Sequence, residues 1–228
     1  MRRLTAAPAG VGLGWRPEIC GLFDELPGLG FCEVIAESLP SRGPMPAPLE
    51  ELRQRGVTVI PHGVRLSLGG AEPVEPARVC FLAGCAESLA APLVSEHIAF
   101  VRAGGVEAGH LLPVPRTREA LDALTHNIKA TQAQLAVPLA LEPIAALFDW
   151  PDNEMTEPDF LTELLDRTDA LLLLDVANVC ANARNRRQDP ALWWDRLPLE
   201  RIAYLHVAGG AVRDGVYHDT HTDPTPPE

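Results

Sequence analysis

The amino-acid sequence predicts an α/β fold, a (β/α)8 barrel of parallel strands that lacks its eighth strand and last helices. Short apolar runs alternate with longer amphipathic stretches along the chain, which is typical of parallel strands covered by helices. Polar residues follow the ends of these runs. The length of 228 residues is slightly below the ~250 residues that a complete barrel usually needs.

Seven apolar runs are predicted as the strands of this barrel. Each run has the length of a strand, is too short for a helix and ends in polar residues. The predicted strands are residues 10–14, 31–36, 57–61, 92–95, 138–141, 170–174 and 202–205.

Six amphipathic stretches between these runs are predicted as helices. Proline at or near the first position, as at Pro17 and Pro158, is typical of a helix start because no N–H partner is needed there. We expect one domain at residues 1–221, truncated at its C-terminal side, and a tail at 222–228. The predicted helices are residues 17–26, 48–55, 75–89, 118–135, 157–167 and 190–196.

An open, doubly wound sheet would show the same alternation of strands and helices. Its dinucleotide-binding form carries a glycine-rich phosphate loop after an early strand. The segment GVGLG at residues 10–14 is followed by Trp15, Arg16 and Pro17 instead of the final glycine of that loop. The polar residues at the strand ends favour the barrel.

Side chains that can bind metals or transfer protons follow successive predicted strands. The carboxyl ends of all the strands meet at one face of a barrel, so we expect these side chains to converge in one cleft. Carboxylates crowded in such a site repel one another unless cations offset their charge. The residues are Glu37, His62, Glu96, His97, Glu142, Asp175, Asn178 and His206.

A further pair of candidate ligands follows the seventh strand. Asp219 and His221 are two positions apart, so in an extended segment both side chains point to the same side. Imidazole and carboxylate ligands without thiolate suit zinc, manganese or iron. The number of candidates exceeds what one ion uses, so we expect two or three ions. The predicted ligands are His62, His97, Glu142, Asp175, Asn178, His206, Asp219 and His221.

The composition argues against several classes of protein. A net charge of −12 disfavours a nucleic-acid partner, because such proteins gather Lys and Arg on one face. No apolar run approaches the ~18–20 residues that span a bilayer, and no signal-peptide core follows the first residues. Five cysteines without a CxxC pair predict reduced thiols. We therefore expect a cytoplasmic protein without a membrane partner.

Several stretches, in order from residue 10 to residue 221, carry a resemblance to a known family. They include FCEVIAE at 31–37, HGV at 62–64, VSEH at 94–97, HVAG at 206–209 and DTH at 219–221. In these stretches the sequence resembles the DUF692 family of multinuclear non-haem iron-dependent oxidases, known from methanobactin biosynthesis. Each stretch alone is a weak signal, but together they are specific.

The resemblance implies a barrel of the triosephosphate-isomerase type that holds two or three iron ions of mixed valence. It places the eight predicted ligands at the metal-binding positions of the family, and among them we expect His62, His97, Glu142 and Asp175 to be catalytic. Family members use dioxygen to modify cysteines of ribosomally made precursor peptides, often with a small partner protein that presents the peptide.

The sequence departs from the family pattern at several positions. Glu96 replaces the usual Asp before His97, and we expect it to hold His97 by a hydrogen bond. Pro143 and Ala177 stand where relatives have Asn, and 185–187 reads Asn-Arg-Arg in place of Asn-His-Gly. Relatives also continue into an eighth strand that carries one more carboxylate ligand.

Two other readings of the sequence stay open. A divalent-metal barrel of the sugar-isomerase or endonuclease type also places His, Glu and Asp at strand ends. The charge of −12 disfavours the nuclease, and Lys129, the only lysine, lies in a predicted helix rather than near the metals. The missing strand motivates the other reading, a non-catalytic relative that acts as a binding partner, because unpaired strand edges invite strand addition by another chain.

Overall fold

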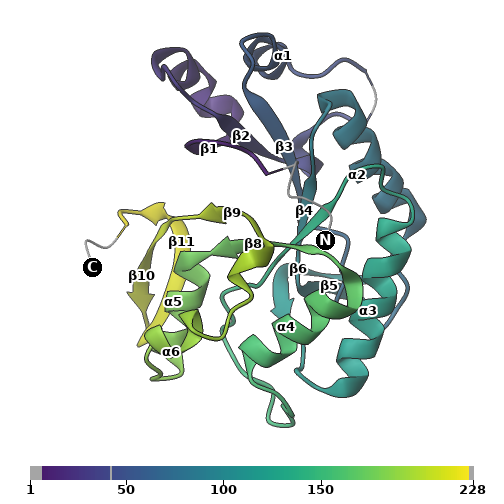
Figure 1. The fold of residues 1–228 in the computed structure, drawn as a ribbon, viewed down its shortest axis with the longest axis vertical. Helices are drawn as coiled ribbons and strands as arrows, with labels where there is room; N and C mark the ends of the chain where they lie inside the picture. Colours follow the sequence, from purple (N-terminus) through teal and green to yellow (C-terminus); the bar gives the residue numbers. More distant parts are fainter. Residues whose placement is uncertain (1–6, 42, 226–228) are drawn as a thin grey trace.

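A computed structural model describes residues 7–41 and 43–225 of the chain. Seven parallel strands form one curled sheet (Figure 1). Its strand order is β1-β2-β3-β4-β7-β8-β9, so strands that follow one another in the sheet also follow one another along the chain. The strands are β1 (Gly12–Trp15), β2 (Phe31–Ile35), β3 (Thr58–Gly63), β4 (Val94–His97), β7 (Leu139–Glu142), β8 (Leu171–Asp175) and β9 (Ile202–His206).

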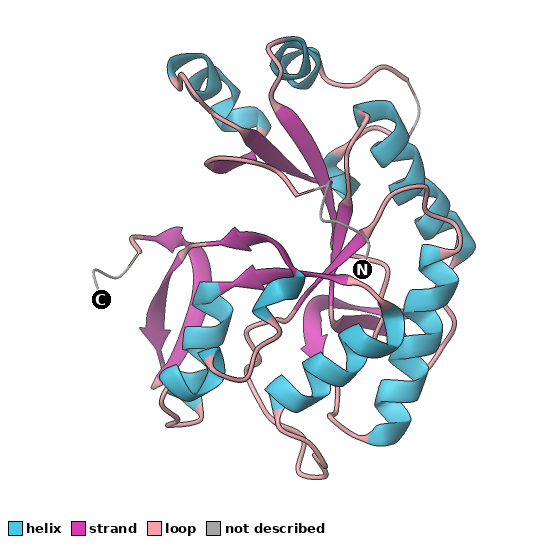
Figure 2. Cartoon of the chain, viewed as in Figure 1, coloured by secondary structure: helices cyan, strands magenta, loops and turns pink. Residues whose placement is uncertain are grey.

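Helices follow most of these strands and lie against one side of the sheet (Figure 2). Thr117 and Thr156 each accept a hydrogen bond from the backbone N–H three residues ahead and so cap α3 and α4. The α-helices are α1 (Ala47–Gln54), α2 (Pro76–Leu89), α3 (Arg118–Gln132), α4 (Glu157–Thr168), α5 (Val176–Asn185) and α6 (Ala191–Trp194). The 3-10 helices are η1 (Pro17–Glu25), η2 (Ala36–Ser38) and η3 (Leu199–Arg201).

Along most strands of the sheet, the side chains alternate between two hydrophobic clusters. Val34, Val59 and Leu172 belong to the large cluster that includes residues of the helices. Ile60 and Leu173, one position further along their strands, belong to a smaller cluster. Because successive residues of a strand point to opposite faces, the second cluster lies inside the curl. The alternation therefore decides which strand-end residues point inward.

The parallel strands and the helical layer confirm the predicted barrel-like α/β fold. The sheet is an open half-barrel, because within residues 7–41 and 43–225 no pairing joins β1 to β9. Leu13 on β1 and Leu205 on β9 are exposed. All seven predicted strands are present, with ends that differ by one or two residues.

Two antiparallel hairpins were not predicted from the sequence. Strand β5 (Ala99–Ala103) pairs with β6 (Val106–Pro113), and β10 (Gly209–Arg213) pairs with β11 (Val216–Asp223). Their turns contain Gly104-Gly105 and Asp214-Gly215, all with positive φ. Such dipeptides are typical of two-residue hairpin turns, so the signal was present in the sequence. Each hairpin follows the carboxyl end of a barrel strand and can contribute to its open face.

Three further details differ from the sequence prediction. The segment predicted as a helix at 17–26 is the 3-10 helix η1. Helix α5 was missed because it begins directly after β8, where Asp175 accepts a hydrogen bond from the N–H of Asn178 and caps the helix. The predicted tail starts at 222, yet β11 extends to Asp223. The last part of that tail, residues 226–228, lies outside the described residues.

Across the described part of the chain, every helix is too short or too polar to cross a bilayer.

Replacing Asn127 with Ala should destabilise the fold. The Asn127 side-chain amide, buried on α3, donates hydrogen bonds to the carbonyls of Leu68 and Gly70 and lies 3.3 Å from that of Glu72. The variant leaves buried carbonyls unpaired, which costs about 1–3 kcal/mol. Urea unfolding should show this loss, whereas Lys129→Ala on the exposed side of α3 should match the wild type. Equal midpoints for both variants would contradict the prediction.

Candidate metal centre

Five of the predicted ligands stand at the carboxyl ends of neighbouring parallel strands. His97 and Asp175 end β4 and β8, and they pair in register with Glu142 and His206, which end β7 and β9. His62 is the fifth residue of β3. Each lies two positions after a residue on the inner face. Glu142, for example, lies two positions after the buried Ala140. The period of two therefore turns all five side chains into the curl.

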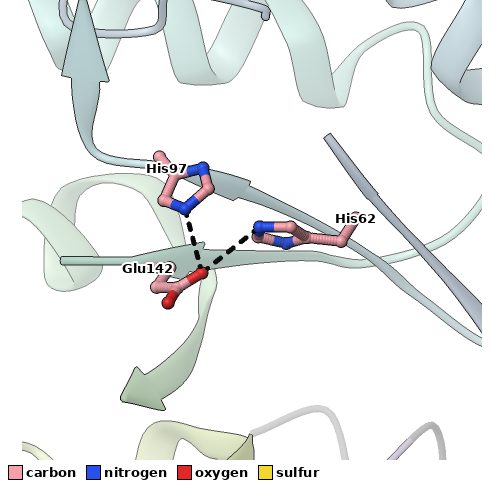
Figure 3. A group of neighbouring side chains, drawn as sticks. All are labelled: His62, His97 and Glu142. Carbon is pink, nitrogen blue, oxygen red and sulfur yellow. Dashed lines mark ion pairs between the residues drawn. The ribbon is translucent and has the colours of Figure 1, made fainter. Parts of the chain in front are cut away.

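The first ligand group consists of His62, His97 and Glu142 (Figure 3). The Nε2 atom of His62 lies 3.4 Å from Glu142 Oε2, and the Nε2 atom of His97 lies 3.3 Å from the same oxygen. The two imidazole rings meet edge to face with centroids 4.6 Å apart. Two imidazole nitrogens and one carboxylate oxygen thus face a common point.

The second group joins Glu142 to Asp175 and His206. His206 Nδ1 lies 3.4 Å from Glu142 Oε1 and 3.7 Å from Asp175 Oδ2. Glu142 therefore presents one oxygen to the first group and the other oxygen to the second. A carboxylate in this position can bridge two metal ions.

The third group consists of Asp175, Asp219 and His221. His221 Nε2 lies 3.2 Å from Asp175 Oδ2 and 2.6 Å from Asp219 Oδ2. Asp219 and His221 come from β11, so the hairpin missed by sequence analysis brings them to the strand ends. The two side chains do meet, as their spacing predicted, although His221 has a φ of +53°. Asp175 joins this group to the second.

Asn178 lies beside the ligand groups as a hydrogen-bond donor. Its Nδ2 atom donates to the carbonyl of Pro143 and lies 3.4 Å from Glu142 Oε1. The sequence predicted Asn178 as a metal ligand, and the structure places its amide N–H against Glu142. The carbonyl of Pro143, one of the departures from the family pattern, is the partner that holds this amide in place.

Two further strand-end carboxylates surround the groups without joining them. Glu96 Oε1 lies 3.6 Å from His97 Nδ1 and accepts a hydrogen bond from the His97 N–H, while its other oxygen accepts one from the Leu66 N–H. This is close to the role expected for Glu96. Glu37 instead accepts from the N–H of Val64, and burial raises its pKa.

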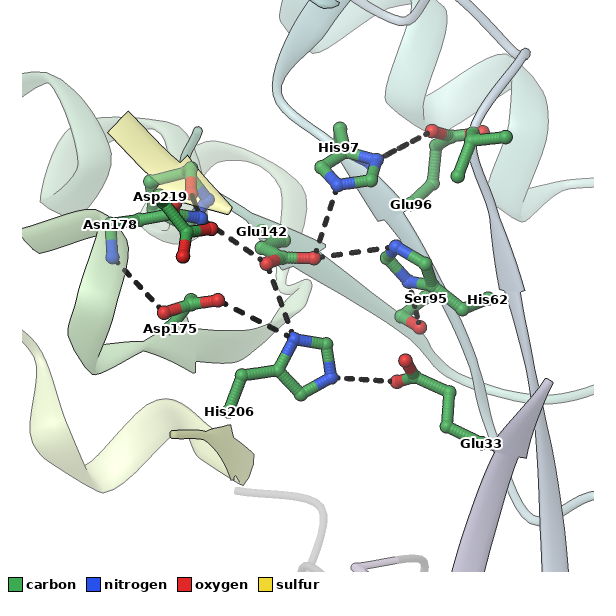
Figure 4. A network of polar contacts seen from close by, with 12 residues as sticks. Glu33, His62, Ser95, Glu96, His97, Glu142, Asp175, Asn178, His206 and Asp219 are labelled. Atoms are coloured by element: carbon green, nitrogen blue, oxygen red, sulfur yellow. Dashed lines mark hydrogen bonds and ion pairs between the residues drawn. The ribbon is translucent and has the colours of Figure 1, made fainter. Parts of the chain in front are cut away.

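Two residues that sequence analysis did not select, Ser95 and Glu33, contact the outer nitrogens of His62 and His206 (Figure 4). His62 Nδ1 lies 2.8 Å from Ser95 Oγ, and His206 Nε2 lies 2.9 Å from Glu33 Oε2. Tyr204 contacts both Ser95 and Glu33. Glu33 left one sequence signal, because it is the only charged residue in the apolar run that forms β2.

The polar atoms of the ligand groups are better satisfied with metal ions bound than without them. Glu142 Oε2, Asp175 Oδ2 and His206 Nδ1 are buried, and within the described residues none of these atoms has a hydrogen-bond partner. Buried polar atoms without partners cost free energy, and clustered carboxylates repel one another. A cation at each group satisfies these atoms. Nitrogen and oxygen ligands without sulfur suit iron, manganese or zinc.

The electrostatics of the site show how strongly the carboxylates attract positive charge. Burial opposes ionisation of Glu142, but His97, His206 and His62 hold its pKa below the usual range. Burial also opposes protonation of His206, yet the neighbouring carboxylates raise its pKa to about 12. Contacts with Asp175 and Asp219 raise the pKa of His221 to about 10. The carboxylates around His206 and His221 thus favour positive charge at these two imidazoles.

A cavity of about 330 Å³ opens onto the ligand groups. Trp15, Val64 and Ile144 contribute apolar surface to its walls, and Arg16 and His110 contribute polar groups. His110 lies on β6, so the hairpin β5–β6 forms part of the wall. This volume accommodates a side chain of a substrate next to the metal groups.

Comparison with known families identifies the chain. Residues 10–228 match the model of the family described as RiPP precursor modification enzyme MbnB/TglH/ChrH. The chain belongs to this family. The resemblance to DUF692 is thereby confirmed.

Two relatives in the same family carry the name UPF0276 protein. The chain is 55% identical to one from Streptomyces avermitilis over 99% of this chain and 48% of the relative, so it spans about half the length of that protein. It is 33% identical to one from Caulobacter vibrioides over 95% of this chain and 78% of the relative.

Solved structures agree with the barrel-like fold. Endonuclease IV from Thermus thermophilus matches with a TM-score of 0.59 at 18% identity, over 92% of this chain and 80% of that one. D-allulose 3-epimerase from Methylomonas sp. matches with a TM-score of 0.55 at 14% identity, over 90% and 74%. At these identities the likeness concerns the fold alone.

Replacing Glu142 with Gln should abolish most metal binding. The variant removes the one carboxylate that faces both the His62 group and the His206 group. We expect a loss of affinity larger than the ~10–100-fold that removal of an outer hydrogen bond costs. Elemental analysis after anaerobic loading would measure it, with Glu119→Gln on the exposed surface of α3 as the control. Full metal content in Glu142→Gln would contradict the bridging role.

Metal binding should release protons and tighten as the pH rises. His206 and His221, with pKa values raised to about 12 and about 10 in the metal-free protein, carry protons near neutral pH that a metal ion must displace. Calorimetric titration in two buffers of different ionisation enthalpy should give different heats. Equal heats in the two buffers would show that no proton is displaced.

Proposed function

We propose that this chain is a multinuclear non-haem iron oxidase that uses dioxygen to modify cysteine residues of a ribosomally made precursor peptide. The observation that carries the proposal is the sharing of buried carboxylates between ligand groups. Glu142 faces both the His62 group and the His206 group, and Asp175 faces both His206 and His221. Shared carboxylates at this spacing are what neighbouring metal ions require.

Two or three iron ions of mixed valence are the cofactor of this proposal. Iron bound at such nitrogen and oxygen ligands supplies redox-active positions at which dioxygen can be activated. His62, His97, Glu142 and Asp175 are the proposed catalytic residues. The proposed metal ligands are His62, His97, Glu142, Asp175, Asn178, His206, Asp219 and His221.

The residues around the centre suit a peptide cysteine as substrate. The cavity beside the ligand groups is large enough for a side chain and its neighbouring backbone. Trp15 and Ile144 contribute apolar surface to its wall. A cysteine side chain in the cavity would lie beside the ligand groups, where its thiolate could bind iron.

We propose a precursor peptide, and no nucleic acid or membrane, as the partner. Membership of a family of precursor modification enzymes supports a peptide substrate. The net charge of −12 opposes close approach to a phosphate backbone. The proposal includes a small partner protein that presents the peptide.

We also propose that residues 1–221 form one domain. A cytoplasmic location suits the free thiols of Cys80 and Cys180, which are exposed.

Loading with iron and incubation with a peptide substrate test the proposal. The chain is purified without oxygen, loaded with ferrous iron and examined by elemental analysis and Mössbauer spectroscopy. It is then given oxygen and the short cysteine-containing peptides encoded next to its gene, and products are identified by mass spectrometry. We expect several irons per chain, oxygen consumption and a mass change that disappears when cysteine is replaced by serine.

The same experiment separates the proposal from its two rivals. Full activity with zinc or manganese on a sugar or a nucleic acid, without oxygen, would support an isomerase or endonuclease and overturn the oxidase. A chain that binds the peptide but leaves it unchanged under all these conditions would support a non-catalytic binding partner.

A further inference from the structure

A continuous chain of hydrogen bonds connects two histidines that belong to different ligand groups. His62 Nδ1 contacts Ser95 Oγ at 2.8 Å, Ser95 Oγ contacts Tyr204 Oη at 2.7 Å, and Tyr204 Oη contacts Glu33 Oε2 at 2.6 Å. The same Glu33 oxygen contacts His206 Nε2 at 2.9 Å. On both histidines the contact is made by the ring nitrogen that faces away from Glu142.

The direction of every hydrogen bond in this chain follows from Glu33. An ionised carboxylate only accepts, so Tyr204 and His206 must both donate to it. Tyr204 has a single hydroxyl proton, and that proton is used on Glu33, so Tyr204 accepts from Ser95. Ser95 also has a single proton, which is used on Tyr204, so Ser95 accepts from His62. The proton of His62 is therefore on Nδ1.

This order leaves one particular nitrogen of each histidine free for a metal. With its proton on Nδ1, His62 has a lone pair on Nε2, the atom 3.4 Å from Glu142 Oε2. With its outer proton on Nε2, His206 turns Nδ1 toward Glu142 Oε1. We propose that Glu33 is a positioning residue that, through Tyr204 and Ser95, sets the metal-binding tautomers of histidines in two ligand groups at once.

The residues around this series of hydrogen bonds hold it in this arrangement. Ser95 is completely buried and Tyr204 is 6% exposed, and the Tyr204 ring packs edge to face on Phe31 with centroids 5.8 Å apart. Burial strengthens the hydrogen bonds that Ser95 and Tyr204 make. Glu33 lies on β2 and Tyr204 on β9, which are not neighbours in the sheet. Their contact therefore crosses the interior of the curl.

The inference rests on the metal centre of the proposed function and is independent of the proposed oxidation. Nuclear magnetic resonance of the full chain with ¹⁵N-labelled histidine, loaded with Zn²⁺, reports which ring nitrogen carries the proton. We expect the proton on Nδ1 of His62 and on Nε2 of His206. A proton on Nε2 of His62, or on Nδ1 of His206, would overturn the inference without any variant.

Variants test whether Glu33, through Tyr204 and Ser95, determines which nitrogen of His62 carries the proton. Tyr204→Phe keeps the ring and removes the hydroxyl, so the proton of His62 should no longer be confined to Nδ1. Zn²⁺ binding should weaken by about 10–100-fold, and the proton of His206 should stay on Nε2. Ser95→Ala should have the same effect on His62. Glu33→Gln keeps the shape but introduces an N–H donor, so it should alter both histidines. Tyr217→Phe, at the only other tyrosine, is the matched control and should behave as the wild type.

The outcomes separate this inference from the proposed function. If the wild type binds Zn²⁺ and Tyr204→Phe shows the same affinity and the same imidazole signals, the positioning role fails and the metal centre stands. If the wild type binds neither Zn²⁺ nor Fe²⁺, the proposed function fails, while the tautomer of His62 in the metal-free chain still decides the inference. Should Tyr204→Phe fail to fold, Ser95→Ala and the wild-type signals give the decision.

Discussion

The carboxylate of Glu142 is the group on which the rest of the site depends. It is buried at the end of β7 and lies within 3.4 Å of nitrogen atoms of three histidines. A carboxylate stays ionised in such a place only when positive charge is close by, because burial alone would favour its neutral form. Three imidazoles lie beside this carboxylate, and a bound cation would supply the same kind of charge. The buried carboxylate is therefore the reason why the site favours positive charge.

The fold supplies this arrangement through sheet register. Because β4 pairs with β7 and β8 pairs with β9 in parallel, His97 stands beside Glu142 and Asp175 stands beside His206. The alternation along each strand turns these side chains into the curl, while their neighbours pack against the helices. Hairpin β10–β11 then adds Asp219 and His221 from outside the sheet. A half-barrel of seven strands thus gathers three connected ligand groups.

The outer contacts of the histidines matter as much as the inner ones. His62, His97 and His206 each turn one nitrogen toward Glu142 and the other toward Ser95, Glu96 or Glu33. A ligating histidine needs such an outer partner to fix its ring and its tautomer. Ser95 and Glu96 lie on β4, which also carries His97, and Glu33 lies on β2. Strands of the same sheet therefore supply the candidate ligands and their outer partners.

Sequence alone determined the class of fold and selected the polar residues at the strand ends as candidate ligands. Apolar runs of strand length mark the seven strands of the parallel sheet. The polar residues that follow most of these runs are what a parallel sheet brings to one face. The hairpins, helix α5 and the roles of Glu33 and Tyr204 were decided by tertiary structure. Glu33 is 173 positions from His206, and a contact over that separation leaves no local pattern. Likewise, only the packed structure shows that the two oxygens of Glu142 face different histidines, because side-chain direction at a strand end depends on every neighbour that surrounds it.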